Sequence, residues 1–183
     1  SKLVMAGIWQ QNEKRAWDRR ELAGRYFGLR SAEDRPVVDL AEPDRAGNAA
    51  LLASYPAPNQ RRRGALFDCG AADDVWVNGE PLLAGLAVLK DRDEILLGGR
   101  TRLYFSTEEL PAVVPYPGAE APEFCARCHG PLVAGAPAVR CPSCGRWCHQ
   151  AAARPCWTYG PGCPLCGHPT AFDAGLRWSP EEI

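Results

Sequence analysis

The chain has 183 residues, of which 46% are hydrophobic and 23% charged, and its formal net charge is −1. This length accommodates one ordinary domain and a small module, but not two large domains. The near-neutral charge creates no overall field that would favour nucleic acid or an anionic membrane. The apolar runs are also much shorter than the roughly 20 residues that a membrane-spanning helix needs. We therefore expect partners other than nucleic acid and membrane.

The N-terminal residues SKLVMAGIW do not follow the charged, apolar and small-residue order of a secretory signal peptide. We therefore expect a cytoplasmic protein, in a reducing compartment where clustered thiols bind metal rather than form disulfides. The basic residues comprise eighteen arginines and only three lysines. Together with many alanines, glycines and prolines, this bias suggests a GC-rich bacterial genome.

The first predicted element is a helix over residues 12–27, NEKRAWDRRELAGRYF, in which Trp17, Leu22 and Tyr26 could share one face. Short apolar runs bounded by turn residues follow, and they predict a series of strands. The clearest are residues 35–41 (RPVVDLA), 49–55 (AALLASY) and 61–69 (RRRGALFDC).

The next stretch contains the strongest turn signal of the chain. Asn78-Gly79 lies between apolar residues in DVWVNGEPLL, which is the typical sequence of a tight hairpin. Residues 86–106 continue with apolar runs that are broken at Arg92-Asp93 and at Gly98-Gly99. Many short strands separated by turns predict a mainly β fold, a sandwich or barrel, over residues 1–109.

Residues 110–124, LPAVVPYPGAEAPEF, contain four prolines. Because proline fixes φ and keeps the preceding residue extended, this segment is predicted to be a semi-rigid linker. A cysteine-rich module at residues 125–168 follows. The remaining tail, residues 169–183, is expected to return Phe172, Leu176 and Trp178 to the body of the protein.

Eight of the nine cysteines lie between residues 125 and 166, and six of them form three CxxC pairs. Two intervening residues let both sulfurs of a pair reach one metal ion, and zinc takes four such ligands. Six thiols do not complete two sites, so the remaining ligands must come from Cys148, His149 and Cys156. Cys148 and His149 are adjacent and point in different directions, and we therefore select His149 with Cys156. The sequence thus predicts two structural zinc ions with no open coordination position.

The spacing permits two ligand pairings. In a sequential scheme the first two CxxC pairs form a zinc ribbon and the other ligands form the second site. In a cross-brace scheme the pairs alternate between the two ions. The twelve residues that separate the first two pairs suit both schemes.

Residues 125–166 resemble a RING finger, specifically the prokaryotic RING family and the RING variants with histidine as fifth ligand. The resemblance rests on the ligand order, on the final CPLC and on Trp157 directly after the sixth ligand. PHD fingers share this order, but they usually carry a tryptophan where this chain has Pro161. The resemblance implies the cross-brace, in which the ligands of the first ion are Cys125, Cys128, His149 and Cys156. Those of the second ion are then Cys141, Cys144, Cys163 and Cys166.

RING fingers bind a ubiquitin-conjugating enzyme in a shallow apolar groove, which the resemblance assigns here to Ala126, Trp157, Pro164 and Leu165. Because a two-zinc module has few other large side chains, Trp157 could instead belong to its core. It implies a ubiquitin-ligase-like adaptor that promotes transfer of a ubiquitin-like protein to lysine, by positioning and without a catalytic residue of its own. Gly167 and His168 stand where many RING ligases have a cationic residue. The alternative is a non-enzymatic two-zinc module that binds or scaffolds other proteins.

Residues 75–106 resemble the second half of a forkhead-associated (FHA) domain through Val77-Asn78-Gly79 and the apolar-leucine-glycine strand that ends at Gly98. The family's phosphothreonine site uses a Gly-Arg pair and a Ser-Arg-x-His motif. Here the corresponding segments are Leu29-Arg30 and Arg45-Ala46-Gly47-Asn48, so the serine and histidine are absent. The resemblance implies a degenerate FHA-like sandwich that docks another protein, with Arg30 as the remaining candidate for phosphopeptide contact.

Overall fold

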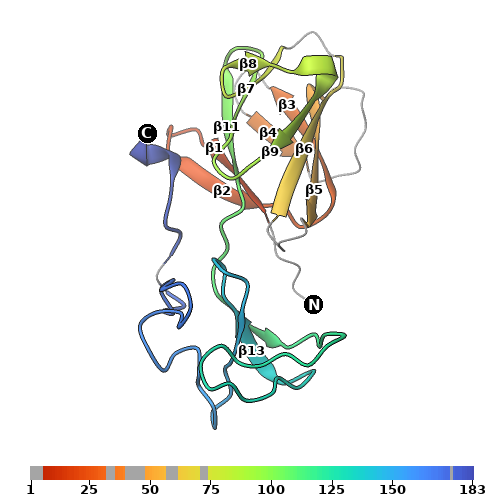
Figure 1. The fold of residues 1–183 in the computed structure, drawn as a ribbon. Coiled ribbons are helices and arrows are strands. Elements are labelled where there is room, and N and C mark those ends of the chain that lie inside the picture. The colour runs from red at the N-terminus through yellow and green to blue at the C-terminus, as the bar shows by residue number, and fades with distance from the viewer. Residues whose placement is uncertain (1–5, 32–35, 40–47, 57–61, 71–73, 174) are drawn as a thin grey trace. The chain divides into compact units, whose positions relative to one another are not determined.

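The computed structural model describes residues 6–31, 36–39, 48–56, 62–70, 74–173 and 175–183. Within these residues the regular structure is almost entirely β, with two short 3-10 helices at Leu83–Gly85 and Pro180–Glu182. The chain divides into two compact units (Figure 1). The sandwich unit comprises Val4–Glu108 and Trp178–Ile183, and the cysteine-rich unit comprises Glu109–Arg177.

The sandwich unit contains two antiparallel sheets, as Figure 1 shows. The six-stranded sheet has the order β2-β1-β11-β10-β7-β8. Its strands are β1 (Gly7–Gln11), β2 (Trp17–Glu21), β7 (Val75–Val77), β8 (Glu80–Pro81), β10 (Glu94–Leu97) and β11 (Thr101–Ser106). The five-stranded sheet has the order β4-β3-β5-β6-β9. Its strands are β3 (Tyr26–Ser31), β4 (Pro36–Asp39), β5 (Ala50–Pro56), β6 (Arg62–Asp68) and β9 (Leu86–Leu89). The expected mainly β sandwich is confirmed.

The core of the sandwich unit consists of alternate residues from both sheets. Ile8 and Phe105 come from the six-stranded sheet and Leu52 and Leu66 from the five-stranded sheet, and all four are fully buried. Successive side chains of a strand point to opposite faces, so the apolar runs of these strands place every second residue between the sheets. The predicted strands over residues 35–41, 49–55 and 61–69 correspond to β4, β5 and β6.

The predicted helix over residues 12–27 is wrong, because this segment forms β2 and the start of β3. The Asn12 side chain accepts hydrogen bonds from the backbone N–H groups of Lys14 and Ala16 at 2.9 and 3.1 Å. This local turn reverses the chain, and β2 then pairs with β1 in antiparallel register. Such a side-chain-to-backbone turn competes with helix formation at its first step.

The hairpin predicted at Asn78-Gly79 joins β7 to β8, which pair in antiparallel register. Asn78 and Gly79 have φ values of 52° and 80°. Two consecutive residues with positive φ are what a tight type I′ turn requires, and asparagine and glycine adopt this conformation at the lowest cost.

The segment expected to be a linker, residues 110–124, belongs instead to the cysteine-rich unit. It forms β12 (Val113–Pro115), which pairs with β13 (Pro137–Arg140), and β13 pairs with β14 (Trp147–His149). Strand β12 lies at the edge of this three-stranded sheet, where proline is tolerated because no ladder hydrogen bond is lost. Tyr116 follows it and is buried, with its ring 5.3 Å from that of Trp147.

The end of the chain returns to the sandwich unit through Trp178, as expected from the sequence. The Trp178 ring contacts Trp9 and Tyr104 edge to face, at centroid distances of 6.4 and 5.7 Å. The guanidinium carbon of Arg92 lies 5.3 Å from the Trp178 ring centroid. Phe172 and Leu176, the other residues expected to return, belong to the cysteine-rich unit.

Candidate metal centres

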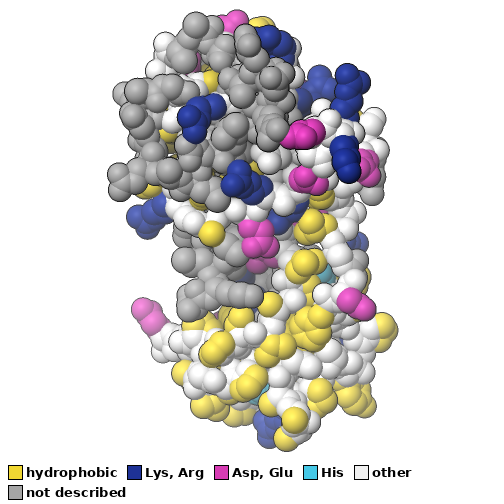
Figure 2. All heavy atoms as spheres, turned by 180° about the vertical axis from the view of Figure 1, so that it is seen from behind, with side chains coloured by type: hydrophobic (Ala, Val, Ile, Leu, Met, Phe, Trp, Pro, Cys, Tyr) yellow, Lys and Arg dark blue, Asp and Glu magenta, His cyan; other side chains and the backbone are white. Residues whose placement is uncertain are grey.

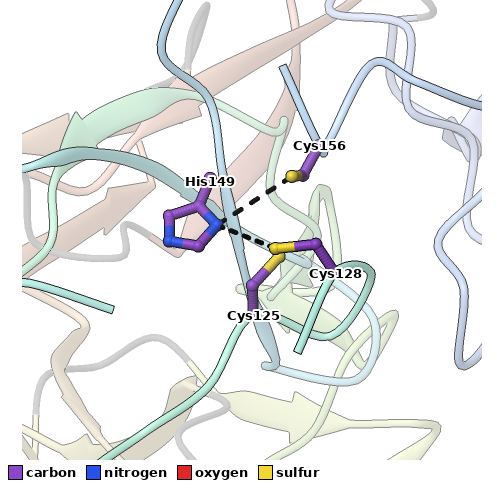
Figure 3. Close-up of side chains that lie close together, drawn as sticks. All are labelled: Cys125, Cys128, His149 and Cys156. Atoms are coloured by element: carbon purple, nitrogen blue, oxygen red, sulfur yellow. Dashed lines mark hydrogen bonds between the residues drawn. The ribbon is translucent and has the colours of Figure 1, made fainter. Parts of the chain in front are cut away.

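The first ligand cluster consists of Cys125, Cys128, His149 and Cys156, whose ligand atoms all lie within 4.8 Å of one another. Figure 3 shows the three sulfurs turned toward the His149 ring. His149 Nδ1 lies 3.4 Å from Cys128 Sγ and 3.9 Å from Cys156 Sγ. Cys125 and Cys128 come from one turn of the chain, and His149 comes from β14.

The second cluster consists of Cys141, Cys144, Cys163 and Cys166, also within 4.8 Å of one another. Cys141 Sγ lies 3.5 Å from Cys166 Sγ, and Cys144 Sγ lies 3.8 Å from Cys163 Sγ. The ligand pairs therefore alternate between the clusters along the chain, which is the cross-brace order and not that of a zinc ribbon.

These distances fit a tetrahedral metal ion. Four sulfurs at 2.3 Å from zinc would lie about 3.8 Å from one another, and a nitrogen ligand would lie slightly closer to them. Three thiols with one imidazole, and four thiols, are also the donor sets of structural zinc sites. Each cluster can thus hold one metal ion, with all four positions filled by protein ligands.

All three CxxC pairs adopt the same turn. In each turn, the backbone N–H four residues after the first cysteine donates to that cysteine's carbonyl oxygen, at 2.9 to 3.0 Å. The first cysteine's own N–H donates to the carbonyl oxygen five residues later, at 2.8 to 2.9 Å. The donor residues His129, Gly145 and Gly167 have φ values of 57°, 77° and 73°. Two of the three turns meet this left-handed requirement with glycine, whereas the first uses His129.

The remaining nitrogen of His149 has its own partner. Nε2 lies 3.0 Å from the carbonyl oxygen of Pro131, to which an Nε2–H group can donate. Such a hydrogen bond leaves Nδ1 without a proton and points it at the three sulfurs. A metal-binding histidine is usually held in this way by an acceptor outside the site.

One thiol in each cluster favours the thiolate form. Burial raises the pKa of Cys125, but backbone N–H donors from Cys128, His149 and Arg127 outweigh it and lower the pKa to about 6. Burial also raises the pKa of Cys166, but hydrogen bonds from the backbone N–H of His168 and from the neighbouring thiols outweigh it and lower the pKa to about 7. Since metals bind thiolates, both clusters contain a ligand that ionises readily near neutral pH.

Cys148 is fully buried and belongs to neither cluster. It lies on β14 directly before His149, and the strand turns the two side chains to opposite faces. Burial, followed by the charge of Cys125, raises the pKa of the Cys148 thiol to about 12. Cys148 therefore serves as a small apolar core residue beside Val139.

Trp157, expected either to anchor a partner or to form part of the core, is completely buried, so its assignment as an anchor is corrected. Its ring packs in the core of the cysteine-rich unit, among the ligand cysteines and Val139. Its Nε1–H donates to the carbonyl oxygen of Thr170 at 2.9 Å, so the polar end is also satisfied. A unit with few other large side chains uses its tryptophan as core.

The other residues expected in the groove differ in exposure. Ala126 is half-buried against the core, whereas Pro164 is exposed and Leu165 is 60% exposed. An aromatic residue that the sequence reasoning missed, Tyr159, is 81% exposed. The Arg127 guanidinium carbon lies 5.9 Å from the Tyr159 ring centroid. The signal for Tyr159 was present, because it too lies close to the sixth ligand, Cys156.

Large hydrophobic side chains are exposed over much of the cysteine-rich unit, where Figure 2 shows yellow side chains with few charged ones among them. The described residues of this unit that are exposed and large are Leu110, Val113, Phe124, Val133, Tyr159, Leu165 and Phe172. Such a concentration in a small unit is typical of a surface that binds other proteins.

Arg30, the candidate for phosphopeptide contact, lies on β3 and is exposed. Of the aligned Arg45-Ala46-Gly47-Asn48 segment, only Asn48 falls among the described residues. Asn48 is buried beside Gly28, where an added Cβ would lie 2.6 Å from its side-chain oxygen. A buried asparagine packed on the sheet is poorly placed to replace the missing histidine as a phosphate donor.

No family model matches the chain, and no curated protein matches it. Among solved structures it is similar to the yeast Dun1 FHA domain, determined by NMR in complex with a doubly phosphorylated (pT) peptide derived from Rad53 SCD1. The identity is 20% and the TM-score 0.42, over 58% of this chain and 77% of that chain. Among the described residues, no helix is long and apolar enough to cross a membrane.

Proposed function

We propose that the chain is a RING-type, ubiquitin-ligase-like adaptor whose cysteine-rich unit holds two zinc ions and binds a conjugating enzyme charged with a ubiquitin-like protein. The observation that carries this proposal is the alternation of the ligand pairs between two four-ligand clusters. This order is the one implied by the RING resemblance, and it distinguishes the unit from a zinc ribbon.

The zinc ions would act as structural cross-links. All eight ligand positions belong to the protein, which leaves none for a substrate or a reacting water. The chain's own residues would then contribute a rigid surface, because the three CxxC turns are fixed by the metal. Catalysis on such a surface consists of holding the charged enzyme's thioester in a conformation open to attack by a lysine.

The docking surface in this proposal is formed by Tyr159, Pro164 and Leu165. Arg127 connects the segments that carry these residues. It contacts the Tyr159 ring and also donates to the carbonyl oxygen of Gly162, two residues before Pro164. An exposed aromatic ring beside aliphatic side chains on a rigid base is the usual centre of a small interface. Tyr159 thus takes the role that was first assigned to Trp157.

The experiment is single-turnover discharge of the conjugating enzyme's thioester to free lysine, in the presence of the zinc-loaded full chain. The conjugating enzyme used is the one whose gene lies nearest to the gene of this chain. We expect acceleration that Tyr159→Ala or Leu165→Ala reduces about tenfold or more, since truncating a central interface residue costs ~2 kcal/mol. Val133→Ala, an exposed apolar residue outside this surface, is the matched control and should retain activity. Binding and zinc content are measured on the same samples.

The second candidate is a non-enzymatic two-zinc module that binds or scaffolds proteins, attached to a sandwich that docks a further protein. It is favoured by Gly167 and His168, which follow Cys166 where many RING ligases have a cation. The same experiment separates the two candidates. Binding of the charged conjugating enzyme without acceleration, or no interaction at all, would support the scaffold and overturn the ligase.

A further inference from the structure

The outward face of the five-stranded sheet carries exposed apolar side chains next to the place where Asn48 covers Gly28. Leu52, Leu66 and Leu89 are fully buried in the core. Because side chains alternate along a strand, the residues next to these leucines point outward. The outer apolar face consists of Tyr26, Leu51, Ala53, Ala65, Phe67, Leu86 and Val88. Tyr26, Phe67, Leu86 and Val88 are 55%, 40%, 46% and 50% exposed.

Strand register places these residues in two rows across the sheet. One row runs from Tyr26 through Ala53 and Ala65 to Val88, and the second contains Leu51, Phe67 and Leu86. The first row has its small residues in the middle and its large ones at both ends. Tyr26 and Val88 are separated by three strand spacings, about 14 Å. A helix, roughly 10 Å wide, fits between them with an apolar side chain over the alanines.

Register places Asp39 of β4 opposite Gly28 at one edge of this sheet, whereas the exposed charged residues described near β6 and β9 are cationic. Arg63 precedes Ala65 by two residues on β6, faces the same side and is exposed. Lys90 follows Val88 by two residues and is also exposed. The described outward positions of β3, β5, β6 and β9 include no acidic residue. A complementary partner would therefore place carboxylates beside its apolar residues.

The size of the face argues against a second copy of the chain as its occupant. The four exposed side chains present about 400 Å² in all, whereas a stable interface buries roughly 800 Å² on each partner. An amphipathic helix needs a smaller apolar area on its partner, because only one stripe of its own surface is apolar. We propose that the outer apolar face docks an amphipathic helix of a partner protein, with an aliphatic stripe flanked by acidic residues.

This inference does not depend on the proposed function, since it concerns the sandwich unit and no metal ligand. The probes are two synthetic stapled helices of equal length with the same leucine stripe, one flanked by glutamates and the other by lysines. Each is titrated into the isotope-labelled, zinc-loaded full chain, and binding is followed by the chemical shifts of backbone amides.

We expect the glutamate-flanked helix to bind about tenfold more tightly than the lysine-flanked one, because rim charges select the partner. The shifts should map to Ala53, Ala65 and Val88. Val88→Glu should weaken this binding about tenfold or more, and Arg63→Glu, an exposed change that leaves the core intact, should reverse the preference between the helices. Val133→Glu in the cysteine-rich unit is the matched control. It should change neither the affinity for the glutamate-flanked helix nor the preference between the two helices.

Three results would overturn the proposal. They are equal affinity for both helices, absence of binding to either, and shifts that map away from the face. Self-association that Val88→Glu abolishes would instead assign the face to a second copy of the chain. Because discharge of the conjugating enzyme is measured separately, failure here leaves the proposed function intact.

Discussion

Arg127 donates a hydrogen bond of 2.8 Å to the carbonyl oxygen of Gly162, and through it one ligand cluster is tied to the other. Arg127 lies between Cys125 and Cys128 of the first cluster, and Gly162 directly precedes Cys163 of the second. The same guanidinium donates to the carbonyl oxygen of Cys156 at 2.6 Å. One cation therefore joins backbone segments that the metals alone would connect only through their ligands.

We predict that Arg127→Ala lowers the free energy of unfolding of the cysteine-rich unit by about 2–3 kcal/mol, because hydrogen bonds from a charged group are among the stronger ones. Arg127→Lys should retain only part of this free energy of unfolding, since lysine has no planar fork with which to donate to both carbonyl groups. Thermal unfolding at fixed zinc concentration measures the difference. Equal stability of Arg127→Ala and the unchanged chain would contradict a linking role.

Metal content gives the second prediction. Native mass spectrometry should find two zinc ions per chain, and a strong chelator should unfold the cysteine-rich unit, because structural zinc contributes roughly 10 kcal/mol or more to folding. Near-ultraviolet circular dichroism follows the loss, since Trp147 and Trp157 lie in this unit. A chain with one zinc ion, or an unchanged spectrum after chelation, would rule out the two-site assignment.

A pair of adjacent substitutions tests the ligand choice at Cys148 and His149. Cys148→Ala should retain both ions, because the Cys148 thiol lies outside both clusters. His149→Ala should lose one ion, since it leaves the first cluster with three ligands. Zinc release measured by a colorimetric chelator distinguishes the two variants. Loss of zinc from Cys148→Ala in a folded chain would assign the thiol as a ligand instead.

Trp157→Ala should unfold or strongly destabilise the cysteine-rich unit, by about 3–5 kcal/mol, because a fully buried ring leaves a large cavity. Trp157→Phe should lose less, since a phenyl ring still fills part of the site and only the pyrrole edge with its hydrogen bond to Thr170 disappears. Chemical denaturation gives both values. A fully stable, zinc-loaded Trp157→Ala variant would mean that the ring is dispensable to the core.

The left-handed turn at His129 provides the last prediction. His129→Gly should raise the free energy of unfolding by up to about 1 kcal/mol, because glycine adopts positive φ without the cost of a Cβ. Gly167→Ala should lower it by about the same amount, and no atom within 4 Å would clash with the new methyl group. Chemical denaturation measures both changes in the free energy of unfolding. Opposite signs for the two variants identify the conformational cost of positive φ as the cause of these changes.

The sequence predicted the features that adjacent residues decide, and it missed those that depend on which strands pair and how side chains pack. The CxxC pairs and the Asn78-Gly79 turn depend on adjacent residues, and both form as expected. The helix over residues 12–27 was wrong because Asn12 closes a turn and β2 then pairs with β1. The spacing of apolar residues carried no information about either effect.

Two further errors have the same origin. Residues 110–124 were predicted as a linker from their prolines, but an edge strand accommodates proline and β13 supplies its partner. Trp157 was expected at the surface because of its place beside a ligand. Its position in the sequence does not specify which way the ring turns, and that is set by Thr170 and the ligand cysteines packed around it.

The return of Trp178 to Trp9 and Tyr104 makes the cysteine-rich unit a loop inserted in the sandwich unit, closed at both ends by the chain itself. Closing a disordered loop costs an entropy that grows with the logarithm of its length. Metal ions bound in the two clusters would keep most of the segment from Glu109 to Arg177 ordered, so the flexible length to be closed would be short. Metal loss would then lengthen the flexible loop and weaken the packing of the last six residues on the sandwich unit. Chain entropy alone would thus couple metal binding to the packing of the C-terminus.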